Sequence, residues 1–407
     1  MIKFILSLSL FLAGLGIIAK LTLANEINVF NRPSPLITQT LDIQEKIQAG
    51  LDLLKHSQPL ALENKIIRYK SGKVVTTNET LRKQIALAIF NTKNGAVFEK
   101  RVWVKEDEIK NYGKTKMLAL EPVEAGEPLD IQPKYWNSFN TFYEVEGRPE
   151  LIVVANKYLL ESKYLTGLPE KSKNKYSEIF YVPYSTALHR PELVEAGKRY
   201  IEARVETAFT DLTNHGLFQD STSNPVSKEF VKTIMLVEHV DPDSFFIAAD
   251  GGKELPERVL VIIGANQERA YRYTGSPAGA NGLAQFIKPT YNTIVRNYPS
   301  AGLIADYALG MADHTNAIKA MVLFFDAYKK NIVAKIADKN ILNQLGITEE
   351  MLAATYNGGP NRVIRAVNNY GLAWLGRQLE LPKSKRNFKT ETLDYIKKFL
   401  AIRELKI

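Results

Sequence analysis

The stretch TIMLVEHVDPDSFF, from Thr233 to Phe246, places a carboxylic acid near the end of an apolar run with helical spacing. On a helix, Glu238 shares a face with four apolar residues one and two turns earlier: Phe230, Val231, Ile234 and Met235. Its carboxylate is therefore expected to point toward the core, where burial raises its pKa. A carboxylic acid that stays protonated near neutral pH is able to donate a proton in catalysis. The simpler interpretation is a helix-end glutamate that turns to solvent or pairs with an arginine, and periodicity alone favours it.

The residues around this stretch predict a mainly helical C-terminal half. Pro191 suits the start of a helix. One helical face then continues through six residues: Leu193, Gly197, Tyr200, Ile201, Val205 and Ala208. The next helix is predicted to begin with Asn224 as its N-cap and Pro225 at its first position, and to end before Pro242. Glu238 then falls in or just before the last turn.

One segment of this half has a different pattern. ERVLVIIGANQERAYRYT, from Glu257 to Thr274, contains two runs rich in β-branched and aromatic residues on either side of Gly264. Such runs around a small-residue turn are typical of a β-hairpin. We therefore predict a small antiparallel insert among the helices.

The first half of the chain mixes helix and strand. A first helix is indicated by apolar residues at helical spacing, namely Ile43, Ile47, Leu51 and Leu54. TLRKQIALAIF, from Thr80, predicts a second helix, whereas VFEKRVWV, PELIVV and EIFYVPY are typical of strands. The polar stretch EKSKNKYS, from Glu170 to Ser177, is a candidate loop between domains.

These patterns predict an α+β fold with two domains, as the length of 407 residues also suggests. Residues 25–185 form a mixed α+β domain without a motif that we connect to chemistry. Residues 186–407 form a mainly α-helical domain with the small β-hairpin insert.

The first 24 residues predict export. Lys3 precedes an apolar run from Phe4 to Ala19, and Thr22 and Ala24 suit a cleavage site, so residues 1–24 resemble a secretory signal peptide. The alternative is an uncleaved anchor, although Lys20 interrupts the run before it spans about 30 Å of hydrocarbon. We expect a protein of the periplasm or cell envelope, or one that is secreted.

Composition narrows the partners and the chemistry. The chain has no cysteine, which excludes disulfides, thiolate metal sites and a cysteine nucleophile. Its formal net charge of +9 favours an anionic partner, and for an exported protein a membrane surface or an acidic cell-wall polymer fits better than nucleic acid. General solubility explains the charge equally well. The five histidines have no paired metal-ligand spacing, so we predict neither a metal site nor a cofactor.

Two later segments add to the case for Glu238. SPAGANGLAQFIKPTYN, from Ser276 to Asn292, is a glycine-rich loop that leads into a helix. AATYNGGPNRVIRAV, from Ala353 to Val367, predicts a helix that ends at Gly358 and Gly359, with Pro360 opening the next.

Together these segments resemble the soluble-type lytic transglycosylases, whose catalytic domain is similar to goose-type lysozyme. That family has a glutamate at the end of an apolar helix, a loop running into glycine-leucine-methionine-glutamine, and then alanine-tyrosine-asparagine-x-glycine-proline. This chain has, in the same order, Glu238, GANGLAQ from Gly279 to Gln285, and TYNGGP from Thr355 to Pro360. TETLDYIKKFL, with Glu391 and Tyr395, is similar to the family's closing helix. The resemblance covers roughly Val231 to the C-terminus, with gaps, and none of the first half.

The resemblance implies a lysozyme-like domain in which Glu238 is the catalytic acid and then the base. Tyr356 would hydrogen-bond to Glu238 and orient it. Gln285 and Asn357 would contact the N-acetyl groups and hydroxyls of the sugar. Taken alone, Tyr356 fits an ordinary buried aromatic and Asn357 a helix-end cap.

Further residues carried over from the family would orient groups or contact substrate. Gly282 and Gly358 would let the backbone approach the glycan closely. Tyr395, in the segment similar to the closing helix, is added to this candidate set. The implied partner is a glycan strand of peptidoglycan, and no nucleic-acid partner is expected. Residues 25–185 lie outside the resemblance, and proteins of the cell envelope are a candidate partner for them.

The family's reaction needs only one carboxyl group from the protein, whereas most glycosidases use two. The N-acetyl group of N-acetylmuramic acid assists departure of the leaving group, and the same glutamate then removes the proton of the C6 hydroxyl. A 1,6-anhydro ring closes and no water is consumed. Asp241 and Asp243 follow Glu238 but lie beyond the predicted end of its helix.

Some residues depart from the family pattern. His239 replaces the usual serine, Ala284 a methionine and Thr355 an alanine, which puts the sugar subsites in more doubt than the acid. His239 fits a surface histidine at the helix end better than a group that tunes Glu238. The basic run KKFL, with Lys397 and Lys398, fits a solvated helix face better than a glycan contact. A hydrolytic lysozyme on the same site, or a silent wall-binding module, remains an alternative function.

Overall fold

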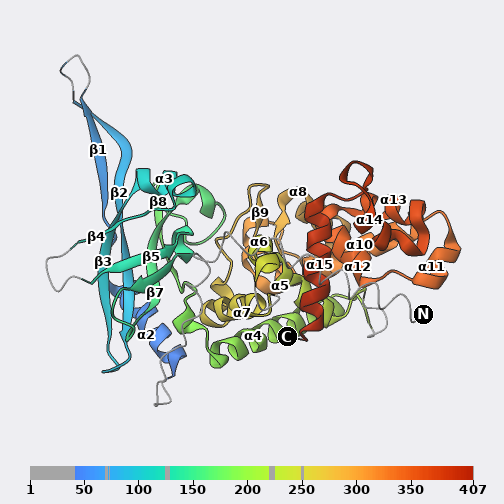
Figure 1. The fold of residues 1–407 in the computed structure, drawn as a ribbon, viewed down its shortest axis with the longest axis horizontal. Coiled ribbons are helices and arrows are strands. Elements are labelled where there is room, and N and C mark those ends of the chain that lie inside the picture. Colours follow the sequence, from blue (N-terminus) through green and yellow to red (C-terminus); the bar gives the residue numbers. More distant parts are fainter. Residues whose placement is uncertain are drawn as a thin grey trace, which may run out of the picture. The chain divides into compact units, whose positions relative to one another are not determined.

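The computed structural model describes residues 42–68, 72, 74–123, 129–219, 225–248 and 252–406. In this part of the chain an antiparallel sheet with its helices comes first and a helical part follows (Figure 1), which confirms the predicted α+β class. The predicted signal peptide, residues 1–24, and the predicted N-cap Asn224 lie outside the described residues. No helix within the described ranges is both long and apolar enough to cross a bilayer.

The first part is built on a six-stranded sheet in the order β4-β3-β2-β7-β8, with β1 paired to the first part of β2. The strands are β1 (Leu62–Arg68), β2 (Val74–Asn91), β3 (Val97–Lys105), β4 (Leu120–Pro122), β7 (Leu151–Glu161) and β8 (Tyr176–Tyr181). The predicted strands on β3, β7 and β8 are confirmed. The helix predicted from Thr80 is wrong, because that segment is the central strand β2. Residues Ile85–Phe90 are all buried, so this strand lacks the alternation that identifies strands with one exposed face.

Helix α2 (Ile43–His56) packs on this sheet and confirms the first predicted helix. All four residues that predicted it are buried. Gly50 permits close packing, because a Cβ at this position would lie 2.9 Å from Val154 of β7 and 3.0 Å from Ala88 of β2. Helix α3 (Glu106–Thr115) and a two-stranded ribbon of β5 (Ile131–Tyr135) and β6 (Phe142–Val145) complete this part.

The loop from Glu170 to Ser177, predicted to lie between domains, instead leads from β7 into β8 of the same sheet. The change from strand to helix comes after β8, where a short connection leads to α4 (Pro191–Asn214). The proposed limits of 25–185 and 186–407 stay a prediction.

The helical part begins with α4, whose start at Pro191 confirms the sequence prediction. The elements that follow are α5 (Lys228–His239), α6 (Pro242–Ile247), α7 (Glu254–Asn266), β9 (Ala280–Asn281), β10 (Phe286–Ile287), α8 (Lys288–Asn297), α9 (Tyr307–Ala312), α10 (His314–Lys335), α11 (Lys339–Leu345), α12 (Glu349–Gly358), α13 (Pro360–Tyr370), α14 (Trp374–Glu380) and α15 (Thr390–Glu404). Helix α5 starts three residues later than predicted, with Ser227 as its N-cap, and ends before Pro242 as expected.

The hairpin predicted between Glu257 and Thr274 is wrong, because its whole first run and Gly264 lie in helix α7. A Cβ on Gly197 of α4 would lie 2.1 Å from the carbonyl oxygen of Leu260, and one on Gly264 would lie 2.2 Å from that of Leu193. The two helices therefore pack backbone against backbone, and this contact outweighs the strand preference of the β-branched residues. A small antiparallel pair does occur, but later, between β9 and β10.

Candidate active site

Glu238 lies in the last turn of α5, as the periodicity predicts. The hydroxyl of Tyr395, from α15, donates a hydrogen bond of 2.6 Å to its Oε1. The residue keeps some exposed surface. Burial of its carboxyl nevertheless raises the pKa of Glu238 from 4.5 to about 7, although the Tyr395 hydrogen bond and the positive charge of Lys398 both lower it. Glu391, a like charge, raises it further. A group with this pKa is protonated in a large fraction of molecules at neutral pH.

Tyr356 does not make the hydrogen bond predicted for it. Its single hydroxyl proton is donated to the backbone carbonyl of Ala284, so the same hydroxyl has no proton left for Glu238. The ring packs among aromatic side chains, with centroid distances of 5.4 Å to Phe286, 5.1 Å to Phe324 and 5.4 Å to Phe325. Tyr395 donates the hydrogen bond that was expected from Tyr356.

The loop between Gly279 and Phe286 carries two of the predicted contact residues. Gln285 has a left-handed backbone with φ of +49°, and its amide donates 2.7 Å to the Gly282 carbonyl, so this side chain is bonded back to its own loop. Gly282 has φ of +69°, and a Cβ there would lie 2.4 Å from the Met311 carbonyl oxygen. The protein's own packing thus requires glycine at this position, independently of the predicted approach of a glycan.

Asn357 and Gly358 lie at the end of α12, where both face Thr392 of α15. The Thr392 hydroxyl donates 2.8 Å to Oδ1 of Asn357, and a Cβ on Gly358 would lie 2.8 Å from Thr392 Cγ2. Both residues are partly exposed. Asn357 is therefore linked to the helix that also supplies Tyr395, and no described residue accepts from its Nδ2, which is able to donate to a ligand.

His239 is not the surface histidine that the sequence favoured. Its ring stacks on Tyr271 with a centroid distance of 3.6 Å, and Nε2 lies 2.9 Å from the carbonyl of Leu283. Because a carbonyl only accepts, Nε2 carries the proton. Burial lowers the pKa of His239 to about 3, so the ring is neutral at ordinary pH and holds the loop after β9.

Lys398 is the residue of this site that the sequence interpretation missed. It is only 5 % exposed, and its ammonium donates to the carbonyls of Val237 and Val240, at 2.9 and 2.6 Å. The solvated helix face expected for this basic run holds for Lys397, which is exposed, but not for its neighbour. The one available signal was the i, i+3 spacing between Tyr395 and Lys398, which places them on one face of a helix.

Asp241, which follows Glu238 closely in sequence, has a different role. Asp241 is the N-cap of α6 and accepts from the Ser244 amide at 2.7 Å. Across the described ranges, no group of three or more histidine, aspartate and glutamate side chains is placed to hold a metal ion. What the arrangement offers chemically is one carboxyl group, able to give and take a proton near neutral pH, held by a tyrosine.

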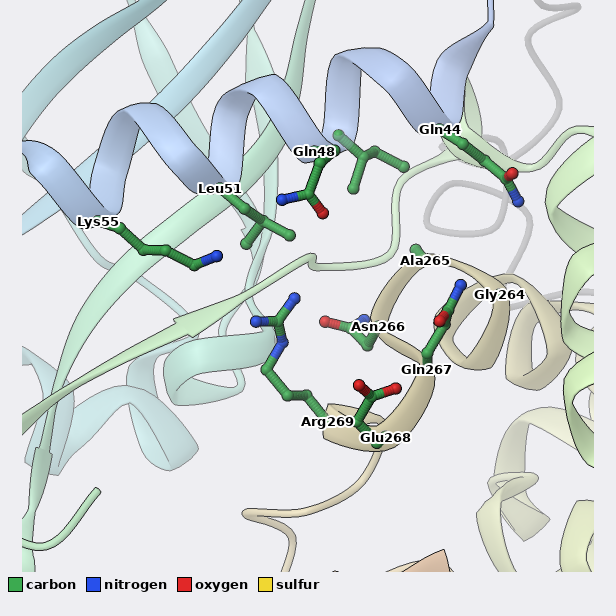
Figure 2. A pocket seen from close by; sticks show the side chains of 11 residues that line it. Gln44, Gln48, Leu51, Lys55, Gly264, Ala265, Asn266, Gln267, Glu268 and Arg269 are labelled. Carbon is green, nitrogen blue, oxygen red and sulfur yellow. The ribbon is translucent and has the colours of Figure 1, made fainter. Parts of the chain in front are cut away.

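The cavity drawn in Figure 2 lies elsewhere, between α2 and the end of α7. It measures about 540 Å³ and is lined by none of the candidate site residues. Lys55 and Gln48 of α2 and Arg269, from the turn after α7, extend into it (Figure 2).

No family model matches the chain, and no curated protein matches it.

Proposed function

We propose that this protein is a peptidoglycan lytic transglycosylase that acts on the β-1,4 bond between N-acetylmuramic acid and N-acetylglucosamine. The observation that carries the proposal is the Glu238 carboxyl, whose pKa is raised to about 7 by burial while Tyr395 donates to it. Two further predicted residues support it, because Tyr356 donates to the Ala284 carbonyl and Gln285 follows Ala284 in the loop between β9 and β10.

In the proposed reaction Glu238 first donates its proton to the glycosidic oxygen as the bond to N-acetylmuramic acid breaks. The N-acetyl carbonyl of the substrate stabilises the positive charge that develops at the anomeric carbon. The glutamate, now ionised, then accepts the proton of the C6 hydroxyl, and the C6 oxygen closes a 1,6-anhydro ring. The acid is regenerated and no second carboxylate is required.

The test is a digest of purified peptidoglycan sacculi, followed by mass analysis of the soluble fragments. Anhydro ends, one water lighter than reducing ends, are the expected product. Reducing ends would instead indicate a hydrolytic lysozyme-type enzyme, and binding to sacculi without soluble fragments would indicate a silent wall-binding module. Either result would overturn the proposed reaction.

Glu238→Gln is expected to reduce fragment release by about 10²- to 10⁴-fold, because an amide of the same size cannot transfer the proton. Glu229→Gln is a matched control on the same helix, since Glu229 is exposed and pairs with Lys232. It should keep full activity. Fragment release by folded Glu238→Gln at the rate of the unaltered protein would exclude Glu238 as the acid.

A further inference from the structure

Lys398 is buried at the point where α5 ends. Its two hydrogen bonds go to the carbonyls of Val237 and Val240, which lie on either side of Glu238 in the chain. The last carbonyls of a helix have no partner within the helix, and a lysine near the C-terminus also interacts favourably with the helix dipole. Within the described residues, no carboxylate forms an ion pair with this ammonium.

Helix α15 therefore holds Glu238 in two ways. Tyr395 of α15 contacts the carboxyl itself, and Lys398, one turn later, holds the backbone on both sides of it. We propose that Lys398 is a positioning residue that fixes the end of α5, and with it the reacting carboxyl. This inference rests on the proposed function, because it assigns a role toward the same acid.

The positive charge of Lys398 also affects the pKa of Glu238. From α15, Lys398 lowers the pKa of Glu238 and Glu391 raises it. The other titratable groups that face this pair are Tyr395 from α15, Tyr356 from α12, Asp241 from the start of α6 and His239 from α5 itself. The tyrosines are neutral at ordinary pH because burial raises the pKa of each well above 10. His239 is neutral as well. The Tyr395 hydrogen bond is thus the largest influence that lowers the pKa of Glu238, and the charge of Lys398 is the next. Burial lowers the pKa of Lys398 itself from 10.5.

The first test is the pH profile of anhydro-fragment release by Lys398→Met. Loss of the charge should move the alkaline limb, where Glu238 loses its proton, upward by about one pH unit. Loss of the two hydrogen bonds should lower kcat about tenfold or more, because the acid is no longer held in position for proton transfer. KM should change little, because Lys398 has no assigned contact with the glycan. Lys398→Arg, which keeps charge and donors, should restore the limb to its original position.

Lys397→Met is the matched control, because Lys397 is exposed and pairs with Asp394 on the surface of the same helix. It should leave the limb and kcat unchanged. If Lys398→Met does not fold, Lys398→Gln, which keeps an N–H donor group without the charge, is measured in the same way.

The second test does not depend on activity. The Glu238 carboxyl is titrated by ¹³C NMR in the unaltered protein and in Lys398→Met, with Glu238→Gln to assign its signal. An upward change in its pKa supports the inference even if no fragments are released, in which case the proposed function alone fails. An unchanged pKa, with an unchanged alkaline limb where there is activity, would reduce Lys398 to a structural residue and overturn the inference.

Discussion

Burial of the Glu238 carboxyl makes the stability of the folded protein depend on pH. Its pKa rises on folding from 4.5 to about 7. Between these values the unfolded chain releases a proton that the folded protein retains, so stability falls as the pH rises through this window and the loss is complete above it. The residue that suits proton transfer is therefore a source of instability at neutral pH.

Glu238→Gln should remove this dependence, since the amide does not titrate and its oxygen still accepts from Tyr395. The difference in unfolding free energy between the variant and the unaltered protein should therefore grow, in favour of the variant, by roughly 1 to 3 kcal/mol as the pH rises from 4.5 to 8. Urea unfolding at the two pH values measures this difference. Equal differences at both values would show that the carboxyl titrates as it does in water.

At the scale of this residue, sequence reasoning reached the right position but the wrong partner. Periodicity placed Glu238 against the core, because the spacing of apolar residues on a helix fixes which face is buried. It does not fix which of two tyrosines, Tyr356 or Tyr395, reaches the carboxyl. Which tyrosine reaches it depends on how α12 and α15 pack against α5, and this packing is seen only in the folded structure.

The loop from β9 to β10 is held by side chains from three other elements. His239 of α5 donates to the carbonyl of Leu283, Tyr356 of α12 to that of Ala284, and Tyr307 of α9 to that of Phe286. The Leu283 and Ala284 carbonyls, which lie in the turn between the two strands, thus accept from side chains of other elements. The position of the loop relative to Glu238 depends on all three donors.

Tyr356→Phe should leave the buried Ala284 carbonyl without its donor and lower the free energy of unfolding by about 1 to 3 kcal/mol. Chemical denaturation measures the change. Tyr328→Phe is the control, because Tyr328 packs 4.4 Å from the Phe324 ring and its hydroxyl has no hydrogen bond with any described residue. Equal losses in the two variants would mean that the Ala284 bond contributes nothing.

Two elements were wrongly predicted for opposite reasons. The segment from Thr80 contains good helix formers, yet it lies in the middle of a sheet covered on both faces, where alternation disappears. The segment from Glu257 contains strand formers, yet Gly197 and Gly264 let α7 pack closely on α4. In both cases tertiary contacts outweigh local preference, and a single sequence does not reveal those contacts.

Across the whole molecule, Asn266 connects the sheet to the helical part. Its buried amide, 2 % exposed, donates 2.9 Å to the carbonyl of Val182, just after β8, and its oxygen accepts from the Val182 amide at 2.8 Å. Nearby, the backbone amide of Tyr271 donates to the hydroxyl of Tyr181, the last residue of β8. Since Tyr271 stacks on His239, this connection reaches the candidate site.

Asn266→Ala should therefore lower the free energy of unfolding by roughly 2 to 4 kcal/mol, because both backbone groups of Val182 lose buried partners. Asn297→Ala, at the exposed end of α8, is the control and should change it by less than about 0.5 kcal/mol. Thermal and urea unfolding measure both. Similar values for the two variants would show that the sheet and the helices do not depend on this contact.

The Tyr395 bond to Glu238 also sets an order of events during synthesis. It joins residues 157 positions apart, so the carboxyl has no donor until that much more chain has been made and folded. A chain interrupted before α15 retains the glutamate, the loop after β9 and Tyr356, yet lacks both the hydroxyl and the ammonium that hold the acid. Under the proposed function, chemistry at Glu238 therefore begins only after the segment that carries α15 has joined the fold, and a protease that removes this helix would end it.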